Sequence, residues 1–383
     1  MSGHAHPLRL EVHQLNDLIG VLGRQGFTVI GPVVQEGALM YAEIQSAGDL
    51  PVGWMETQSG GHYRLERRAD QAHFACTVGP SSVKRFLHPP RATLFQARRT
   101  PDGMDFHAPA DPPPRYAFLG LRACELAAVA IQDTVFLKQE YQDSIYAARR
   151  EAALLIAAEC SIRAADTCFC TSMQTGPQVR ENFDLCLTEV LDDAQHYFLL
   201  RSGSSAGEQI MRELDAASAA EAEQEVARER VNAVAAGIQK TMDTDGIQEL
   251  MYRHYESSQW DEVATRCLSC TNCTMVCPTC FCTTVEDITD LNGESAERVR
   301  RWDSCFTLDF TYANGANIRS SGAARYRQWI SHKLGTWYEQ FDTSGCVGCG
   351  RCITWCPVGI DITEEVARLR RQTALPSGGD HER

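Results

Sequence analysis

The stretch that decides the fold reads Cys267-Leu-Ser-Cys270-Thr-Asn-Cys273-Thr-Met-Val-Cys277-Pro278. The same pattern returns further along the chain as Cys346-Val-Gly-Cys349-Gly-Arg-Cys352-Ile-Thr-Trp-Cys356-Pro357. Both runs have the form C-x2-C-x2-C-x3-C-P, which is the spacing of bacterial two-cluster ferredoxins. Three thiolates separated by two residues each allow a tight loop to reach three irons of one 4Fe–4S cluster, while the fourth cysteine leaves toward the other cluster.

The fourth cysteine of each run predicts a crossed arrangement. We expect one 4Fe–4S cluster to be held by Cys267, Cys270, Cys273 and Cys356. We expect the other to be held by Cys346, Cys349, Cys352 and Cys277. The alternative for clustered cysteines is zinc. A zinc site needs only four tetrahedral ligands, which does not explain two copies of a run in which three closely spaced cysteines are followed by a fourth.

The composition of the whole chain bounds the classes of protein to consider. The 383 residues are 44% hydrophobic with a formal net charge of -14, which argues against a nucleic-acid partner and gives no attraction to an anionic membrane. We see no secretory signal, and the longest apolar runs are too short to span a bilayer. We therefore expect a cytoplasmic protein, in which 17 cysteines indicate metal or redox chemistry rather than disulfides.

Upstream of the two runs, the hydrophobic pattern predicts a sheet covered by helices. Short apolar runs interleave with helical stretches, and the strands are expected at residues 28–30, 39–44, 116–120, 153–158, 183–190 and 196–200. From residue 204 the composition changes to Ala, Glu, Gln and Arg, which favour helix.

The predicted fold class is a multi-domain α+β or α/β protein. We expect a mixed α/β domain over residues 1–203, a helical linker over 204–258, a two-cluster ferredoxin-like domain with an insertion over 259–370, and a flexible tail over 371–383.

A second group of cysteines lies in the α/β region: Cys124, Cys160, Cys168 and Cys170. Cys168-Phe-Cys170 alternates like a strand, which would place both sulfurs on one face about 7 Å apart. Cys124 and Cys160 each follow a predicted strand, and strand ends in α/β sheets converge on one edge. We interpret the four as metal ligands of a third 4Fe–4S cluster. The alternative is four small buried side chains, which free cysteines often are.

A short internal repeat points to three more cysteines. Thr-Cys-Phe-Cys-Thr at residues 167–171 recurs at 279–283, where it supplies Cys280 and Cys282, and Cys305 follows in Arg-Trp-Asp-Ser-Cys. These three could shield a cluster, supply an alternative ligand or carry thiol chemistry. The last two cysteines, in apolar strand-like settings, are predicted core residues: Cys76 and Cys186. A basic stretch from Arg319 to Lys333 either neutralises cluster charge, docks a partner or forms a solvated face.

Taken together, these motifs resemble a known family. Residues 267–282, 301–305 and 346–357, with Arg325-Tyr-Arg, look like the beta subunit of cytoplasmic nickel–iron sulfhydrogenases. Gly120-Leu-Arg-Ala-Cys124-Glu-Leu and residues 168–177 are similar to that family too, so the resemblance extends over about residues 75 to 366. The same architecture is also similar to the A subunit of anaerobic sulfite reductase.

The resemblance implies an electron-transfer subunit of an oxidoreductase complex that is not catalytic alone. Single electrons would pass through the 4Fe–4S clusters between a flavin/NAD(P)-binding reductase subunit and the small and large nickel–iron hydrogenase subunits. The alternative is an electron-transfer subunit of a sulfite, polysulfide or disulfide reductase. No catalytic residue is assigned, because no motif identifies a flavin, a nicotinamide or a substrate pocket.

Overall fold

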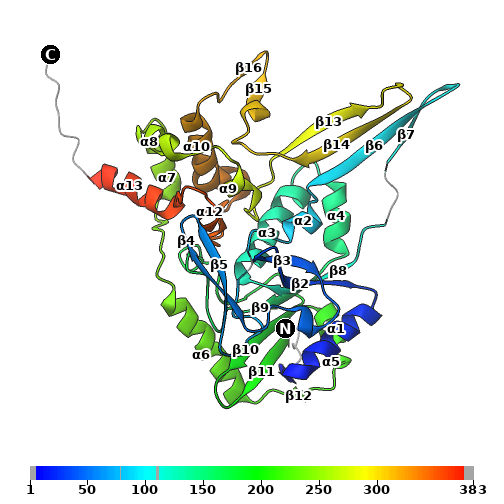
Figure 1. The fold of residues 1–383 in the computed structure, drawn as a ribbon, viewed down its shortest axis with the longest axis vertical. Helices are drawn as coiled ribbons and strands as arrows, with labels where there is room; N and C mark the ends of the chain where they lie inside the picture. Colours follow the sequence, from blue (N-terminus) through cyan, green and yellow to red (C-terminus); the bar gives the residue numbers. More distant parts are fainter. Residues whose placement is uncertain (1–5, 78, 109–111, 375–383) are drawn as a thin grey trace.

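The structure is a computed structural model that describes residues 6–77, 79–108 and 112–374. Its N-terminal half is built on one eight-stranded sheet with the order β12-β1-β11-β10-β9-β8-β2-β3 (Figure 1). The strands are β1 (Leu8–Glu11), β2 (Thr28–Gln35), β3 (Ala38–Glu43), β8 (Tyr116–Leu121), β9 (Leu154–Ala158), β10 (Leu185–Leu191), β11 (His196–Ser202) and β12 (Ala217–Ser218). The four central strands, from β10 to β2, are parallel, and the outer pairings are antiparallel.

Helices cover both faces of this sheet because its central strands are apolar on both sides. Leu154 and Ile156 of β9 belong to the core under α1 and α5, whereas Leu155 and Ala157 face the core under α3. The helices of this half are α1 (Leu15–Arg24), α2 (Lys84–Leu87), α3 (Ala123–Leu137), α4 (Ser144–Glu151), α5 (Ser205–Arg212) and α6 (Glu221–Gly237). The 3-10 turns are η1 (Val12–Gln14) and η2 (Ala47–Asp49).

A four-stranded antiparallel sheet joins distant parts of the chain. Its order is β13-β14-β6-β7, and it projects away from the body of the molecule (Figure 1). The strands are β6 (Arg91–Thr100), β7 (Gly103–His107), β13 (Thr283–Thr289) and β14 (Ser295–Trp302). The pairing of β6 with β14 connects the α/β region to the insertion between the two cysteine runs.

The C-terminal part is helical around the two runs. Its elements are α7 (Ile247–Arg253), α8 (Gln259–Arg266), α9 (Asn272–Met275), η3 (Leu308–Thr311), β15 (Tyr312–Ala313), β16 (Ala316–Asn317), α10 (Gly322–Ser331), η4 (a π-helical turn, His332–Thr336), α11 (Trp337–Phe341), α12 (Arg351–Thr354) and α13 (Ile362–Ala374). A hairpin from the N-terminal half also reaches this part of the chain. It consists of β4 (Trp54–Ser59) and β5 (His62–Arg67), and its turn contacts α12 through the Gly61 N–H, which donates to the Ile353 carbonyl at 3.1 Å.

The predicted mixed α/β class with a C-terminal dicluster domain is confirmed, and the local expectations differ in two places. Residues 168–170 form an irregular loop rather than a strand, because the Phe169 N–H donates to the Gly348 carbonyl instead of to a neighbouring strand. Helix α13 runs past residue 371 to Ala374, and the rest of the predicted tail lies outside the described residues. The domain boundaries stay a prediction. In the described part of the chain, no helix is both long enough and apolar enough to cross a membrane.

Candidate functional site

The two cysteine runs fold into loops of the same shape. The third and fifth positions of each run have left-handed backbone: φ is 49° at Ser269 and 69° at Thr271, and 64° at Gly348 and 74° at Gly350. A short helix follows in each case, α9 in the first run and α12 in the second, and carries the chain toward the fourth cysteine. The duplicated sequence therefore produces a duplicated backbone conformation.

Both loops point backbone N–H groups at sulfur. The N–H of Ser269 donates to Cys267 Sγ at 3.4 Å, and the N–H of Gly348 donates to Cys346 Sγ at 3.5 Å. Such hydrogen bonds stabilise thiolate and cluster charge and are a known means of setting the potential of iron–sulfur clusters.

One cavity brings three cysteines of the first run together with the last cysteine of the second. Its lining includes Cys267, Cys270, Cys273 and Cys356. The side chains of Phe306, Tyr326 and Trp329 supply an apolar wall, and burial raises the pKa of Cys273 well above its usual value. We call these four thiols the outer site because Cys270 is exposed to solvent.

The second group, which we call the middle site, comprises Cys277, Cys346, Cys349 and Cys352. Burial and then the charges of the other three thiols raise the pKa of Cys352. The ammonium group of Lys333 lies inside the protein and donates to Cys277 Sγ at 3.3 Å and to the Gly345 carbonyl at 2.7 Å. The middle site therefore has a buried cation in direct contact with one of its sulfurs.

A third cavity collects the four cysteines of the α/β region. Cys124, Cys160, Cys168 and Cys170 all line it, and we call them the inner site. Cys349 of the middle site reaches the same cavity, as does the buried side chain of Arg351.

One N–H donor of the Arg351 side chain has no hydrogen-bond partner at the inner site. Its Nη2 donates to Glu125 Oε1 at 2.9 Å and its Nε donates to the Gly79 carbonyl at 3.0 Å. Its Nη1 is buried without a hydrogen-bond partner. An orphaned cationic donor beside four thiols fits a site made for an anionic group.

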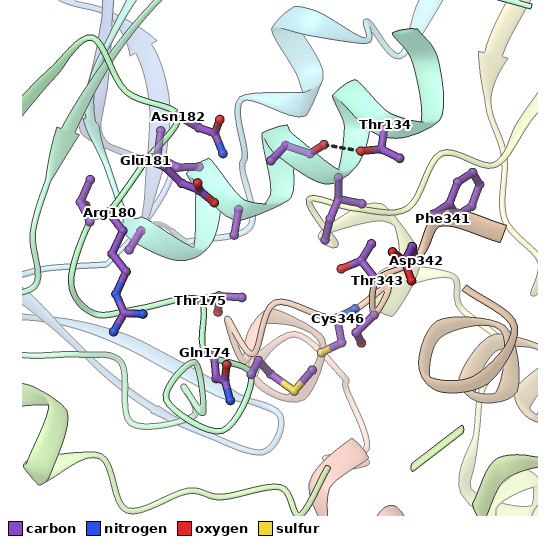
Figure 2. Close-up of a pocket in the computed structure, with 18 of the residues that line it drawn as sticks. Thr134, Gln174, Thr175, Arg180, Glu181, Asn182, Phe341, Asp342, Thr343 and Cys346 are labelled. Carbon is purple, nitrogen blue, oxygen red and sulfur yellow. Dashed lines mark hydrogen bonds between the residues drawn. The ribbon is translucent and has the colours of Figure 1, made fainter. Parts of the chain in front are cut away.

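A polar groove opens next to the middle site. Figure 2 shows Cys346 at its wall, with Gln174 and Thr175 on one side and Asp342 and Thr343 on the other. The groove also runs along α3 and is bordered by Arg180, Glu181 and Asn182. The sulfur nearest the start of the second run is therefore close to the surface at this point.

The remaining cysteines fall into two kinds. Cys76 and Cys186 are fully enclosed in the α/β half, and Cys186 belongs to the core beneath α3. Cys280, Cys282 and Cys305 instead lie beside the middle site, where Lys333 interacts with all three.

Two histidines and a carboxylate form a separate buried group: His73, Glu189 and His196. The Glu189 carboxylate accepts from the N–H groups of His73 and Phe74, each at 2.7 Å, and from His196 Nε2 at 2.8 Å. Burial raises the pKa of Glu189, but these hydrogen bonds outweigh it and hold the pKa at about 2. The group ties residues 73–74 to β10 and has its carboxylate oxygens already satisfied.

The inner, middle and outer sites fit iron–sulfur clusters better than single metal ions. In a tetrahedral zinc site, Zn–S bonds of about 2.3 Å place the sulfurs roughly 3.8 Å apart. Among the described residues, no set of three cysteine sulfurs lies within 4.8 Å of one another. Each site nevertheless offers four thiols, and a four-iron cluster takes four thiolates at wider spacing.

Comparison with known proteins defines the class. Residues 266–360 match the 4Fe–4S dicluster domain, so the chain is an iron–sulfur electron-transfer protein. Over 345 residues it is 29% identical to Sulfhydrogenase 2 subunit beta of Pyrococcus furiosus, a match that covers 89% of this chain and 92% of that subunit. The resemblance to sulfhydrogenase beta subunits is thereby confirmed along nearly the whole sequence. The comparison with solved structures finds no match.

Sequence reasoning missed most of the charged residues around the sulfurs. The basic stretch ending at Lys333 did point to these charges, because neutralising cluster charge was one of the three roles proposed for it. Lys84 carried no signal, because it lies far from the cysteine runs in sequence and reaches them only through the fold. Glu125 belongs to a quoted motif beside Cys124, but nothing local indicated its contact with Arg351.

Proposed function

We propose that this chain is the electron-transfer subunit of a multi-subunit nickel–iron hydrogenase. The observation that carries the proposal is the serial order of the three thiol groups. Cys349 of the middle site lines the inner cavity, and Cys273 of the outer site and Cys352 of the middle site pack against the same apolar core. Bound 4Fe–4S clusters supply one-electron transfer.

The protein's own part in this function is to hold and shield the sulfurs. In the crossed assignment, each ferredoxin-type cluster takes three thiols from one run and one from the other. The Lys333 ammonium at the middle site and the Arg351 guanidinium at the inner site supply buried positive charge. Such charge and hydrogen bonding are the means by which a protein tunes cluster potential.

Partners have access to the series at two places, its outer end and its middle. The exposed Cys270 lies at the outer end, and the groove beside Cys346 opens near the middle. A flavin/NAD(P)-binding reductase subunit and the small and large hydrogenase subunits would then be the electron donors and acceptors. This assignment of partners is supported by the similarity to a subunit named as part of a sulfhydrogenase.

The test is anaerobic purification of the complex with Cys267→Ala. Losing one thiol of the outer site should empty that cluster and stop hydrogen-dependent NAD(P)+ reduction. Iron and acid-labile sulfide are counted in parallel: a loss of about four of each per chain, relative to wild type, fits one emptied 4Fe–4S cluster. An unchanged rate with the outer cluster shown to be missing would sink the proposal.

A further inference from the structure

Three cysteines outside the relay converge at the base of one hairpin. Cys282 directly precedes β13 and Cys305 follows β14, and the Asp303 N–H donates to the Cys282 carbonyl at 2.8 Å. The thiols of Cys282 and Cys305 are hydrogen-bonded to each other, and the thiol of Cys280 is hydrogen-bonded to that of Cys277. The antiparallel pairing of β13 with β14 thus brings together side chains that are 23 positions apart in the printed sequence.

Two buried lysines lie beside these cysteines. Lys84 is 3% exposed and Lys333 is 4% exposed. Lys84 Nζ donates to the carbonyls of Cys277 and Cys280, at 2.9 and 3.2 Å, and lies 4.0 Å from the centre of the Trp302 ring. Within the described chain, neither ammonium group forms an ion pair with a carboxylate.

A buried ammonium group needs nearby negative charge. In the part of the chain that the structure describes, sulfur is left to supply that charge, and Cys277 is the relay ligand whose sulfur contacts a lysine, Lys333. Lys84 lies next to Cys280, because its Nζ donates to the Cys280 carbonyl. Cys277 serves Lys333, whereas Lys84 contacts two carbonyls and the Trp302 ring. Thiolate charge on the three additional cysteines would supply the negative charge that Lys84 needs.

The sequence repeat gives an independent reason to expect metal at this place. The first copy, residues 167–171, carries two thiols of the inner site and packs on one side of the second-run loop through the Phe169 N–H and the Gly348 carbonyl, at 2.8 Å. The second copy, residues 279–283, packs on the same loop through Thr279 Oγ1, which donates to the Gly345 carbonyl at 2.7 Å. Two copies of one Cys-x-Cys unit thus contact one loop, and each copy has a further cysteine close by.

We propose that Cys280, Cys282 and Cys305 bind an iron–sulfur centre of their own, with Lys84 and Lys333 balancing its charge. This site goes beyond the relay of twelve thiols and does not depend on which partners the chain serves. The three sulfurs do not lie within 4.8 Å of one another, which is too wide for a single tetrahedral ion. Three thiolates also leave at least one iron of a four-iron cluster without a cysteine ligand.

The experiment compares the anaerobically purified wild-type complex with the triple variant Cys280→Ser, Cys282→Ser and Cys305→Ser. We expect the variant to lose about three to four irons and about as many sulfides per chain, while the EPR signals of the ferredoxin pair remain. Cys186→Ser is the control, because its thiol is buried in the α/β core, away from the three cysteines. Unchanged iron and sulfide in the triple variant would overturn the proposal.

A second measurement needs no variant. The wild-type complex is treated with iodoacetamide under nitrogen, and the modified cysteines are identified by mass spectrometry. Cys280 and Cys282 are partly exposed, so they should be alkylated only after iron has been removed with a chelator and an oxidant. Alkylation in the iron-loaded protein, or a disulfide joining Cys282 to Cys305, would contradict the proposal. Failure of the relay itself would be distinguishable, because the eight ferredoxin-type cysteines would then be alkylated as well.

Discussion

At the scale of single residues, the buried charges explain how this chain could control its clusters. Lys333 is enclosed in the protein and its Nζ is 3.3 Å from Cys277 Sγ. Burial lowers the pKa of this lysine, but the surrounding thiols outweigh it and raise the pKa well above the usual value, so the side chain stays charged. A fixed positive charge in contact with a ligand sulfur favours the reduced, more negative state of the cluster.

Replacing Lys333 by Met should therefore make the middle cluster harder to reduce. We expect its potential to become more negative by roughly 60 mV or more, which corresponds to a tenfold change in a one-electron equilibrium. An EPR-monitored redox titration of the anaerobic protein measures the shift. Lys138→Met is the control, since Lys138 lies at the end of α3 beside the open groove. A potential unchanged by Lys333→Met would show that this ammonium does not act on the cluster.

His88 makes stability depend on pH. Its ring stacks on Phe136 at 4.6 Å, and both ring nitrogens are buried without a hydrogen-bond partner. Burial, with a smaller contribution from Arg300, lowers its pKa to about 3, against about 6.5 in the unfolded chain. Between these two pH values the unfolded state binds a proton on His88 that the folded state does not bind. The contribution of neutral His88 to the free energy of unfolding is therefore complete above pH 6.5 and is lost as the pH falls toward 3.

We expect the wild type to lose about 1 kcal/mol of unfolding free energy from this group between pH 6.5 and 5.5. Urea unfolding under nitrogen at both pH values gives the difference. His88→Phe should remove that part of the pH dependence, while His62→Phe, at an exposed position, should leave it in place. The same pH slope in His88→Phe and wild type would refute this role for His88.

At the scale of elements, the two cysteine loops share a backbone but differ in surroundings. Gly350 and Thr271 occupy equivalent left-handed positions, with φ values of 74° and 69°. A Cβ on Gly350 would clash with the carbonyl oxygen of Thr167. Glycine is required in the second loop because residues 167–171 pack against it, whereas the first loop borders solvent at Cys270.

Gly350→Ala should consequently destabilise the protein by at least about 2 kcal/mol, from the left-handed backbone and the clash with a carbonyl. Thr271→Ala, at the matching position, should change stability by less than about 0.5 kcal/mol. Urea unfolding and iron content under nitrogen compare the two variants. Equal stability of Gly350→Ala and Thr271→Ala would mean that the packing against residues 167–171 is not as close as described.

Local sequence patterns were enough to predict much of this architecture. The apolar runs of β8, β9 and β11 and the duplicated cysteine spacing each depend on residues close together in the chain. The pairing of β6 with β14 and the approach of Lys84 to Cys280 were not predicted, because nothing local records which distant segments will meet. Residues 168–170 were expected to form a strand because alternation was the only signal, and their contact with the second-run loop replaced that strand with an irregular loop.

At the scale of the whole molecule, the fold turns three separate sets of thiols into a series. The α/β sheet and α3 place the inner site beside Cys349, and the two crossed runs place the middle site beside the outer one. In a series, every electron that travels from one end to the other must use the middle site. Loss of the middle cluster should therefore slow electron transfer along the whole series more than it slows reduction of the inner or the outer cluster.

The most direct test is the rate of hydrogen-dependent NAD(P)+ reduction by the anaerobic complex carrying Cys346→Ala, with EPR spectra of the same sample. The account predicts an empty middle site, at least a hundredfold slower NAD(P)+ reduction, and an outer and an inner cluster that each still accept electrons from their own side. An undiminished rate in a sample shown to lack the middle cluster would contradict the series.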